Sequence, residues 1–344
     1  MYFLEKIEPH LLSEDIHIKE FVLQVLRDYP NVPEEWTAKL VKRMVDSNSN
    51  FMFMELKKHT LNEEAVQFLI EGAKAAAPEN LHMYQQLLTI VEPELAVEHK
   101  QDLSTFLPED VFRLYDILIY GDERQVWAEY SRLLNKLDQS QEYNEALFQQ
   151  ARHAANVLVK KGWITDTEIA HILNENLNED YFKFAGIFAI YLIGALGKKE
   201  YISLLAGLLT REDDVLLEVT ADVLISFQSD QVVNEVSLYV KNPDAIIYGA
   251  SILGTIKSDL AVQELKKAFD TLEYEEDVVF LIEALAHQLT DEAKPFIDEY
   301  MEEGMESFMI ESEQLAYSYY KIMGYEHPEL ENWRRIADAK ESSF

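Results

Sequence analysis

Apolar residues recur at helical spacing along almost the whole chain, in segments of about 10 to 18 residues separated by short polar stretches. In residues 18–45, two such segments flank a turn, and Pro33 stands where the first turn of a second helix accepts proline. Residues 112–134 repeat the pattern, with Gly121 placed to end the first helix. The pattern predicts helical hairpins and an all-α fold.

The C-terminal half carries an internal repeat. Five segments can be aligned at the last large apolar residue of a first helix, and these anchors lie 29 to 34 residues apart. The anchors are Leu196, Phe227, Ile256, Leu289 and Met323. Four positions before them stand Leu192, Val223, Ile252, Leu285 and Tyr319, and three before stand Ile193, Leu224, Leu253, Ala286 and Tyr320. One face of each first helix is therefore expected to be buried.

A second amphipathic helix follows each anchor after a turn of small or polar residues, such as GKKE at 197 or KSDL at 257. Its expected inward residues include Ile202, Leu205, Val233, Val236, Val262 and Leu265. A single hairpin of this size cannot cover its own apolar face. Neighbouring hairpins are therefore expected to stack and share one core.

This repeat resembles the HEAT family, and in particular the short-unit HEAT-like repeats also found in phycobilin lyases. The segment ASILGTIKSDLAVQELKKAF, residues 250–269, carries the resemblance best, and the resemblance covers residues 180–338. It implies a right-handed α-α superhelix, an armadillo-like solenoid of helical hairpins. We then expect HEAT-like repeats over residues 141–344, and less regular hairpins over residues 1–140 that continue the same solenoid.

The charge of the chain restricts its partners. Asp and Glu number 63 against 30 Lys and Arg, a formal net charge of -33. Such a field repels nucleic-acid phosphates and anionic lipid headgroups. We expect no nucleic acid and no membrane as partners, and expect proteins instead, with basic ones favoured by the charge.

The sequence also predicts a cytoplasmic location. The absence of cysteine excludes disulfides, thiolate metal sites and thiol nucleophiles, and suits a reducing compartment. The opening residues include Glu5, Lys6 and Glu8 where a secretion signal needs an unbroken apolar stretch. The most apolar run, residues 181–197, is shorter than the roughly 20 residues needed to cross a bilayer. It is expected to be a buried helix.

Histidines and acids raise the possibility of a metal site. Two Glu-x-x-His pairs, Glu14/His17 and Glu168/His171, have the spacing found in di-iron helical bundles, but so many acids produce about two such pairs by chance. Glu168 also fits a capping box with Thr165. Glu55/His59 and Glu283/His287 are expected to be surface contacts. No zinc-protease, nucleophile-elbow or nucleotide-binding motif occurs. We therefore predict no catalytic residue, cofactor or metal ligand.

Acidic residues are most concentrated from Thr271 to Gly304. Eleven acids stand against the single base Lys294: Glu273, Glu275, Glu276, Asp277, Glu283, Asp291, Glu292, Asp298, Glu299, Glu302 and Glu303. Two interpretations remain open, solvated helix faces or a docking surface for a basic protein. The candidate protein-binding residues are Asp291, Glu292, Asp298, Glu299, Glu302 and Glu303.

The last unit is rich in aromatic residues: Tyr317, Tyr319, Tyr320, Tyr325 and Trp333. At helical spacing, such side chains are expected to cover the end of the stack, although they could also anchor a partner. The function predicted from the sequence is a non-enzymatic protein-interaction or scaffold module with an acidic surface. The alternative is an enzyme or metal-binding protein with an unrecognised site in the concave groove.

Overall fold

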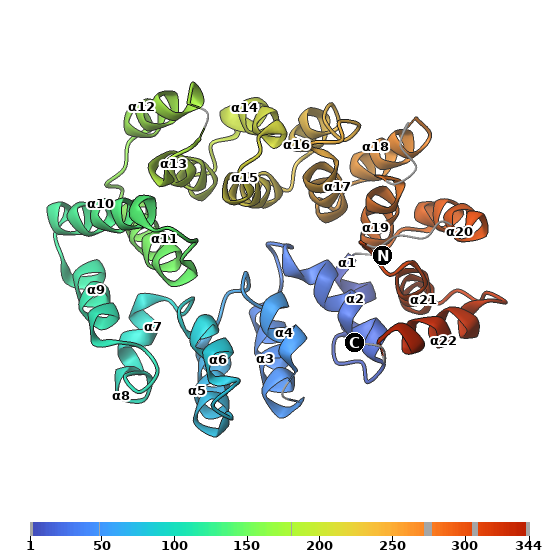
Figure 1. Ribbon diagram of the computed structural model, residues 1–344, viewed down its shortest axis with the longest axis horizontal. Helices are drawn as coiled ribbons and strands as arrows, with labels where there is room; N and C mark the ends of the chain where they lie inside the picture. Colours follow the sequence, from blue (N-terminus) through green and yellow to red (C-terminus); the bar gives the residue numbers. More distant parts are fainter. Residues whose placement is uncertain (1–2, 48, 180, 272–276, 305–308, 342–344) are drawn as a thin grey trace. The chain divides into compact units, whose positions relative to one another are not determined.

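The computed structural model describes residues 3–47, 49–179, 181–271, 277–304 and 309–341 (Figure 1). Over these ranges all regular secondary structure is helical, and the predicted all-α class is confirmed. Contacts divide the chain into two compact units. Unit 1 contains residues 1–30 and 199–344, and unit 2 contains residues 31–198. Unit 2 is therefore inserted between two parts of unit 1. The predicted division at 140/141 rests on repeat regularity and stays a prediction.

Unit 1 begins with two N-terminal helices, α1 (Phe3–Ile7) and α2 (Ile16–Arg27). Its other helices are α14 (Ile202–Gly207), α15 (Asp214–Ser226), α16 (Asp230–Val236), α17 (Ile246–Thr255), α18 (Asp259–Phe269), α19 (Val278–Gln288), α20 (Lys294–Glu303), α21 (Ser312–Met323) and α22 (Leu330–Glu341). Short 3-10 turns cover Glu8–His10, Lys199–Tyr201, Leu208–Thr210 and Asp291–Ala293.

Unit 1 has two rows of helices. α15, α17, α19 and α21 lie side by side in one row, and α14, α16 and α18 form the other (Figure 1). The predicted register is confirmed, because every position three or four before an anchor is buried. The expected inward residues of the second helices, from Ile202 to Leu265, are buried as well. Leu196 and Met323, the first and last anchors, are only half-buried.

The row of first helices continues with α2. This helix packs against α21, although the two are almost 300 residues apart in sequence (Figure 1). Its buried residues include Ile18, Phe21, Val22 and Leu26. Residues 1–30 thus cover the apolar side of α21 that a further hairpin would otherwise have to cover.

The C-terminal ends of neighbouring first helices share hydrogen-bond donors. The side-chain amide of Gln228 donates to the carbonyls of Ile225 at 2.9 Å and Thr255 at 3.3 Å, joining the ends of α15 and α17. One repeat later, Lys257 Nζ donates to Gly254 at 2.6 Å and His287 at 2.7 Å, joining α17 and α19. Gln228 and Lys257 each stand directly after an anchor, so the repeat register extends to these bridges.

Two further side chains donate hydrogen bonds to carbonyls at the ends of the first helices or directly after them. Gln288 donates its side-chain amide to the carbonyls of Leu253 and Ile256. Lys6, from α1, donates to the carbonyl of Leu289. The last four carbonyls of any helix lack partners inside that helix, and buried carbonyls without partners are costly. Placing helix ends next to one another therefore requires these side chains.

Unit 2 contains α3 (Glu34–Ser47), α4 (Asn50–Glu55), α5 (Glu63–Ala75), α6 (Leu81–Leu88), α7 (Pro93–Glu98), α8 (Lys100–Leu103), α9 (Glu109–Tyr120), α10 (Glu123–Gln139), α11 (Glu145–Lys160), α12 (Asp166–Leu177) and α13 (Phe184–Ala195). α9 ends at Gly121, as predicted. The predicted capping box of Thr165 and Glu168 opens α12. Lys161 Nζ donates to three carbonyls at the end of α9, including that of Leu118 at 3.2 Å.

The most apolar run forms α13, and its side chains are largely buried, as expected. Among the residues that the structure describes, no helix combines the length and apolar character needed to span a membrane.

The bridging role of Lys257 gives the first prediction. Lys257→Met removes both bonds and leaves two buried carbonyls without a donor, so the free energy of unfolding should fall by about 2 kcal/mol. Lys257→Gln should cost less than half as much, because Gln228 already makes the equivalent pair of bonds with an amide. Urea denaturation followed by circular dichroism measures both. Equal losses in the two variants would contradict the bridging role.

Candidate protein-binding surface

The six candidate acids lie in one segment of unit 1. Asp291 and Glu292 belong to the 3-10 turn that precedes α20, and the other four lie on α20 itself. Gly304, with φ at +67°, ends this helix in the left-handed conformation that glycine adopts without strain. Glu273, Glu275 and Glu276, which belong to the same acidic stretch of the sequence, lie outside the described residues.

Three of the six acids have partners within unit 1. Glu292 is 2.6 Å from Lys266 Nζ. Asp298 pairs with Lys294 at 2.7 Å and accepts a hydrogen bond from the Tyr320 hydroxyl. Asp291 accepts a hydrogen bond from the Tyr325 hydroxyl. These three carboxylates attach α20 and its preceding turn to α18 and to the α21–α22 hairpin.

The other three acids face solvent. Glu299, Glu302 and Glu303 are exposed, and the described residues place no cation within ion-pair distance of them. Residues three and four apart share one side of a helix, so the three glutamates form a single stripe. We call Glu299, Glu302 and Glu303 the acidic stripe.

The charges on α20 oppose the helix dipole. A helix favours acids at its N-terminus and bases at its C-terminus. α20 begins with Lys294 and ends with Glu302 and Glu303, with no acid in its first turn and no base in its last. Lys294 is compensated by Asp298, whose hydrogen bond raises the pKa of the lysine. The acidic stripe has no such compensation within the described residues. It therefore lowers the stability of the helix that carries it.

The aromatic residues of the α21–α22 hairpin are mostly internal. Tyr317, Tyr319, Tyr320 and Trp333 are buried, as expected for core residues. They do not cover the end of the stack, because α2 packs against α21 and continues the row. Tyr325 is half-buried, and burial together with its hydrogen bond to Asp291 raises its pKa to about 12. The hydroxyl groups of Tyr319, Tyr320 and Tyr325 donate to Thr290, Asp298 and Asp291, and so attach α20 and the turn before it to this hairpin.

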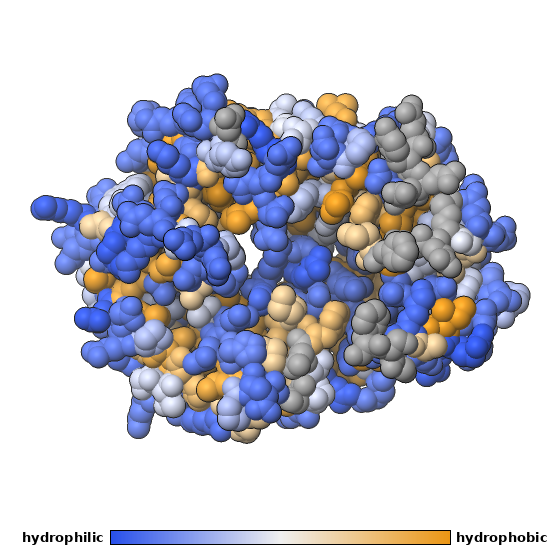
Figure 2. Space-filling view, viewed as in Figure 1, coloured by the Kyte–Doolittle hydropathy of each residue, from blue (hydrophilic) through white to orange (hydrophobic). Residues whose placement is uncertain are grey.

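Hydrophilic residues cover most of the molecular face shown in Figure 2, and hydrophobic residues appear there in separate areas. Many basic side chains already have acidic partners, among them Lys160 with Glu92 and Lys198 with Asp166. One lysine of each adjacent pair at 160–161 and 198–199 is therefore neutralised by an acid.

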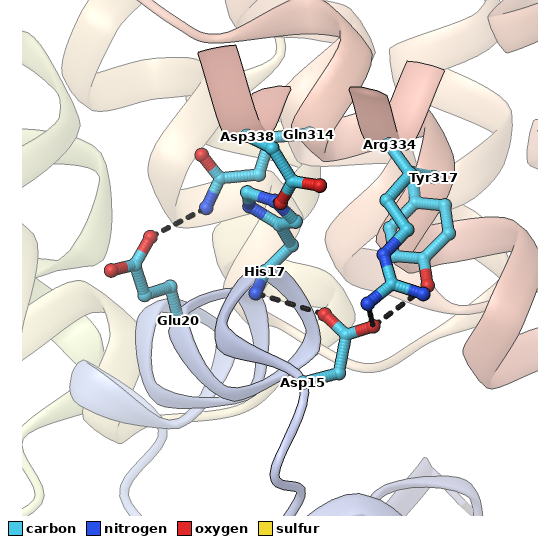
Figure 3. Close-up of polar contacts among 7 residues, drawn as sticks. All are labelled: Asp15, His17, Glu20, Gln314, Tyr317, Arg334 and Asp338. Carbon is cyan, nitrogen blue, oxygen red and sulfur yellow. Dashed lines mark hydrogen bonds and ion pairs between the residues drawn. The ribbon is translucent and has the colours of Figure 1, made fainter. Parts of the chain in front are cut away.

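A second polar cluster joins residues 1–30 to the α21–α22 hairpin (Figure 3). Asp15 caps α2 by accepting from the His17 amide at 3.1 Å, and it also accepts from the Tyr317 hydroxyl at 2.7 Å. His17 Nε2 lies 2.8 Å from Asp338 Oδ1. The side-chain amide of Gln314 donates to Glu20 at 2.7 Å, and Arg334 lies 3.8 Å from Asp15.

This second cluster acts as an interface within unit 1. The His17 side chain is 2% exposed, so no substrate can reach its ring. Its Nε2 pairs with Asp338. His171, from the other pair, is exposed and lies 3.5 Å from Glu175. No group of three His, Asp or Glu that could hold a metal ion occurs among the described residues.

Of the two expected surface pairs, Glu55/His59 is buried and Glu283/His287 is half-buried. Glu55 is 6% exposed and His59 is 8% exposed, and His59 Nδ1 lies 3.3 Å from the Thr37 hydroxyl. Burial raises the pKa of Glu283 to about 6, and Arg27 opposes this rise. Burial lowers the pKa of His287 to about 3, helped by Lys257 and Arg27. For Glu55/His59 the expectation failed because α4 ends at Glu55, so His59 lies beyond that helix. For Glu283/His287, helical periodicity indicates a shared face but not that a neighbouring helix packs over it.

His287 lies where the two parts of unit 1 meet. Its ring packs edge-on against Phe21 of α2, with centroids 5.3 Å apart. Its backbone carbonyl accepts from Lys257, whose pKa burial lowers to about 7. A positive charge on His287 would thus be placed beside a lysine and under an apolar helix.

No family model matches the chain, and the comparison with curated proteins likewise finds no match.

The pKa of His287 predicts a pH dependence. The folded protein keeps this imidazole neutral down to about pH 3, whereas the unfolded chain protonates it near pH 6.5. The resulting stability is complete above pH 6.5 and is lost as the pH falls toward 3. Below pH 4.5, where Glu283 no longer offsets this loss, the native chain should lose about 1.4 kcal/mol per pH unit more than His287→Leu. Urea denaturation at pH 4.5 and 3.5 measures the difference, and parallel losses would contradict the assignment.

Proposed function

We propose that the protein is a non-enzymatic interaction module that binds a basic segment of another protein through the acidic stripe. The observation that supports this best is the charge pattern of α20. The stripe places three uncompensated carboxylates toward the helix end that disfavours them. A partner that supplies lysine or arginine would provide the missing cations. Features that lower stability often serve function, because binding compensates for them.

Charge and apolar contacts would contribute differently to such binding. Carboxylates that face solvent guide a basic partner over a distance and increase its association rate. Affinity needs apolar contacts as well. Met309 is an apolar side chain of unit 1 that is 70% exposed. The proposed location is the cytoplasm, in agreement with the cysteine-free sequence.

We also propose that both units belong to a HEAT-like right-handed superhelix. The two rows of helices in unit 1 and the repeated bridges at Gln228 and Lys257 support stacked, equivalent hairpins. Repeat stacks of this kind present extended surfaces to other proteins. The alternative, an enzyme or metal-binding protein, has no comparable supporting observation among the described residues.

Reversing the charge of the acidic stripe should separate binding from stability. The variant Glu299→Lys/Glu302→Lys/Glu303→Lys should unfold at a higher urea concentration than the native chain, with a gain of about 1 kcal/mol, because bases suit a helix C-terminus. The same variant should lose the partner. Affinity capture from host extract, with quantitative mass spectrometry, measures this loss.

A matched control carries the same change of charge in unit 2. Glu71, Glu98 and Glu142 are exposed acids, and their replacement by lysine should leave the captured partner unchanged. A partner lost equally from both variants would show that only net charge matters. If every captured protein bound the stripe variant as well as the native chain, the acidic stripe would not be the binding surface.

A further inference from the structure

Residues 1–30 belong to unit 1, but the residue that follows them belongs to unit 2. We call residues 1–30 the N-terminal segment. Its contacts with α19, α21 and α22 involve residues far apart in sequence: 321 positions separate His17 from Asp338, and 294 separate Glu20 from Gln314. Every contact between the segment and these helices is non-covalent. We call the surface of α19, α21 and α22 that the segment contacts the receiving surface. Every copy of the chain has this surface.

The receiving surface matches the segment in polarity as well as in apolar area. Asp15 meets a tyrosine hydroxyl and an arginine, His17 meets a carboxylate, and Glu20 meets an amide (Figure 3). On the apolar side, Phe21 packs against His287 and Phe3 lies over Lys257, 4.3 Å from ring centroid to Nζ. These pairs select a segment with the spacing of this chain. A second copy is the occupant that is certain to offer it.

The connection between the segment and unit 2 is a short non-helical stretch with turns at residues 28 and 30–31. Helix α2 ends at Arg27 and α3 begins at Glu34, and Pro30 and Pro33 lie between them. The residue before a proline disfavours helical backbone and prefers an extended conformation. Tyr29 and Val32 both have this restriction. Because the connection lies outside both helices, it can change direction without unfolding α2 or α3, and so can carry its segment away from its own unit.

We propose that the chain exchanges its N-terminal segment with a second copy, so that α1 and α2 of each copy pack on α19, α21 and α22 of the other. The exchanged pair is a symmetric dimer in which each interface repeats the contacts of the monomer. When the N-terminal segment leaves its own unit, the apolar side of α2 becomes exposed, and docking on the second copy buries it again. The equilibrium between monomer and exchanged dimer then depends on the protein concentration relative to the effective concentration of the attached segment. For a short linker this effective concentration is about millimolar.

This proposal does not depend on the proposed function. The acidic stripe lies on α20, and none of its three glutamates contacts the N-terminal segment through a hydrogen bond or ion pair that the described residues show. Exchange would double the number of acidic stripes in one particle. It would therefore allow two-site binding to a basic partner.

The chain has no cysteine, so engineered cysteines can report exchange without background. One copy carries Glu20→Cys and the other Gln314→Cys, replacing two side chains that are hydrogen-bonded within unit 1. The copies are mixed at high concentration, incubated, diluted and treated with a short bismaleimide. Exchange should give about tenfold more of the mixed cross-linked pair than a control in which the second copy carries Glu98→Cys, since docking raises the local concentration of the two thiols.

A second measurement uses the unsubstituted chain. Size-exclusion chromatography with light scattering should show a dimer fraction that increases with concentration and persists for some time after dilution, because undocking of α2 must precede separation. The proposal is overturned if the native chain stays monomeric at every concentration. It is equally overturned if a dimer forms while the Glu20/Gln314 pair cross-links no more than the Glu98 control.

Discussion

Unit 1 depends on the side-by-side packing of α15, α17, α19 and α21. This packing buries an apolar face on each helix, and it also brings together helix ends whose carbonyls have lost access to water. The apolar faces alone would allow the helices to slide along one another. The donors Gln228 and Lys257 fix their longitudinal position, because each must reach the ends of two helices at once. The apolar contacts supply most of the stability, and the hydrogen bonds set the register.

Much of this arrangement could be predicted from the sequence, because it is local and periodic. The buried positions before each anchor follow from helical spacing, and the Thr165–Glu168 cap follows from a four-residue pattern. The docking of α2 on α21 could not be predicted in this way, since no periodicity connects His17 with Asp338. The pattern of residues 18–45 predicted a helical hairpin, but α2 belongs to unit 1 and α3 to unit 2.

The candidate surface was located by composition and refined by geometry. Counting acids gave eleven residues, from which six candidates were chosen, but could not show that Asp291, Glu292 and Asp298 hold α20 in place. Only the paired positions of lysines and tyrosines on α18, α20 and the α21–α22 hairpin distinguish these structural carboxylates from Glu299, Glu302 and Glu303. Lys257 was missed for a related reason. A lysine between helices looks solvent-exposed in sequence, and the buried carbonyls that bind it are contributed by backbone, which no residue pattern reveals.

The position of α2 also affects the order of folding during synthesis. The ribosome makes Phe21 and Val22 long before it makes α21, and all of unit 2 is translated in between. Unit 2 can fold as it emerges, because its residues are continuous. Unit 1 has to wait, with an apolar helix exposed at one end of a growing chain. Chaperones that bind short apolar helices on ribosome-attached chains would therefore find a natural substrate in this segment until α21 is released.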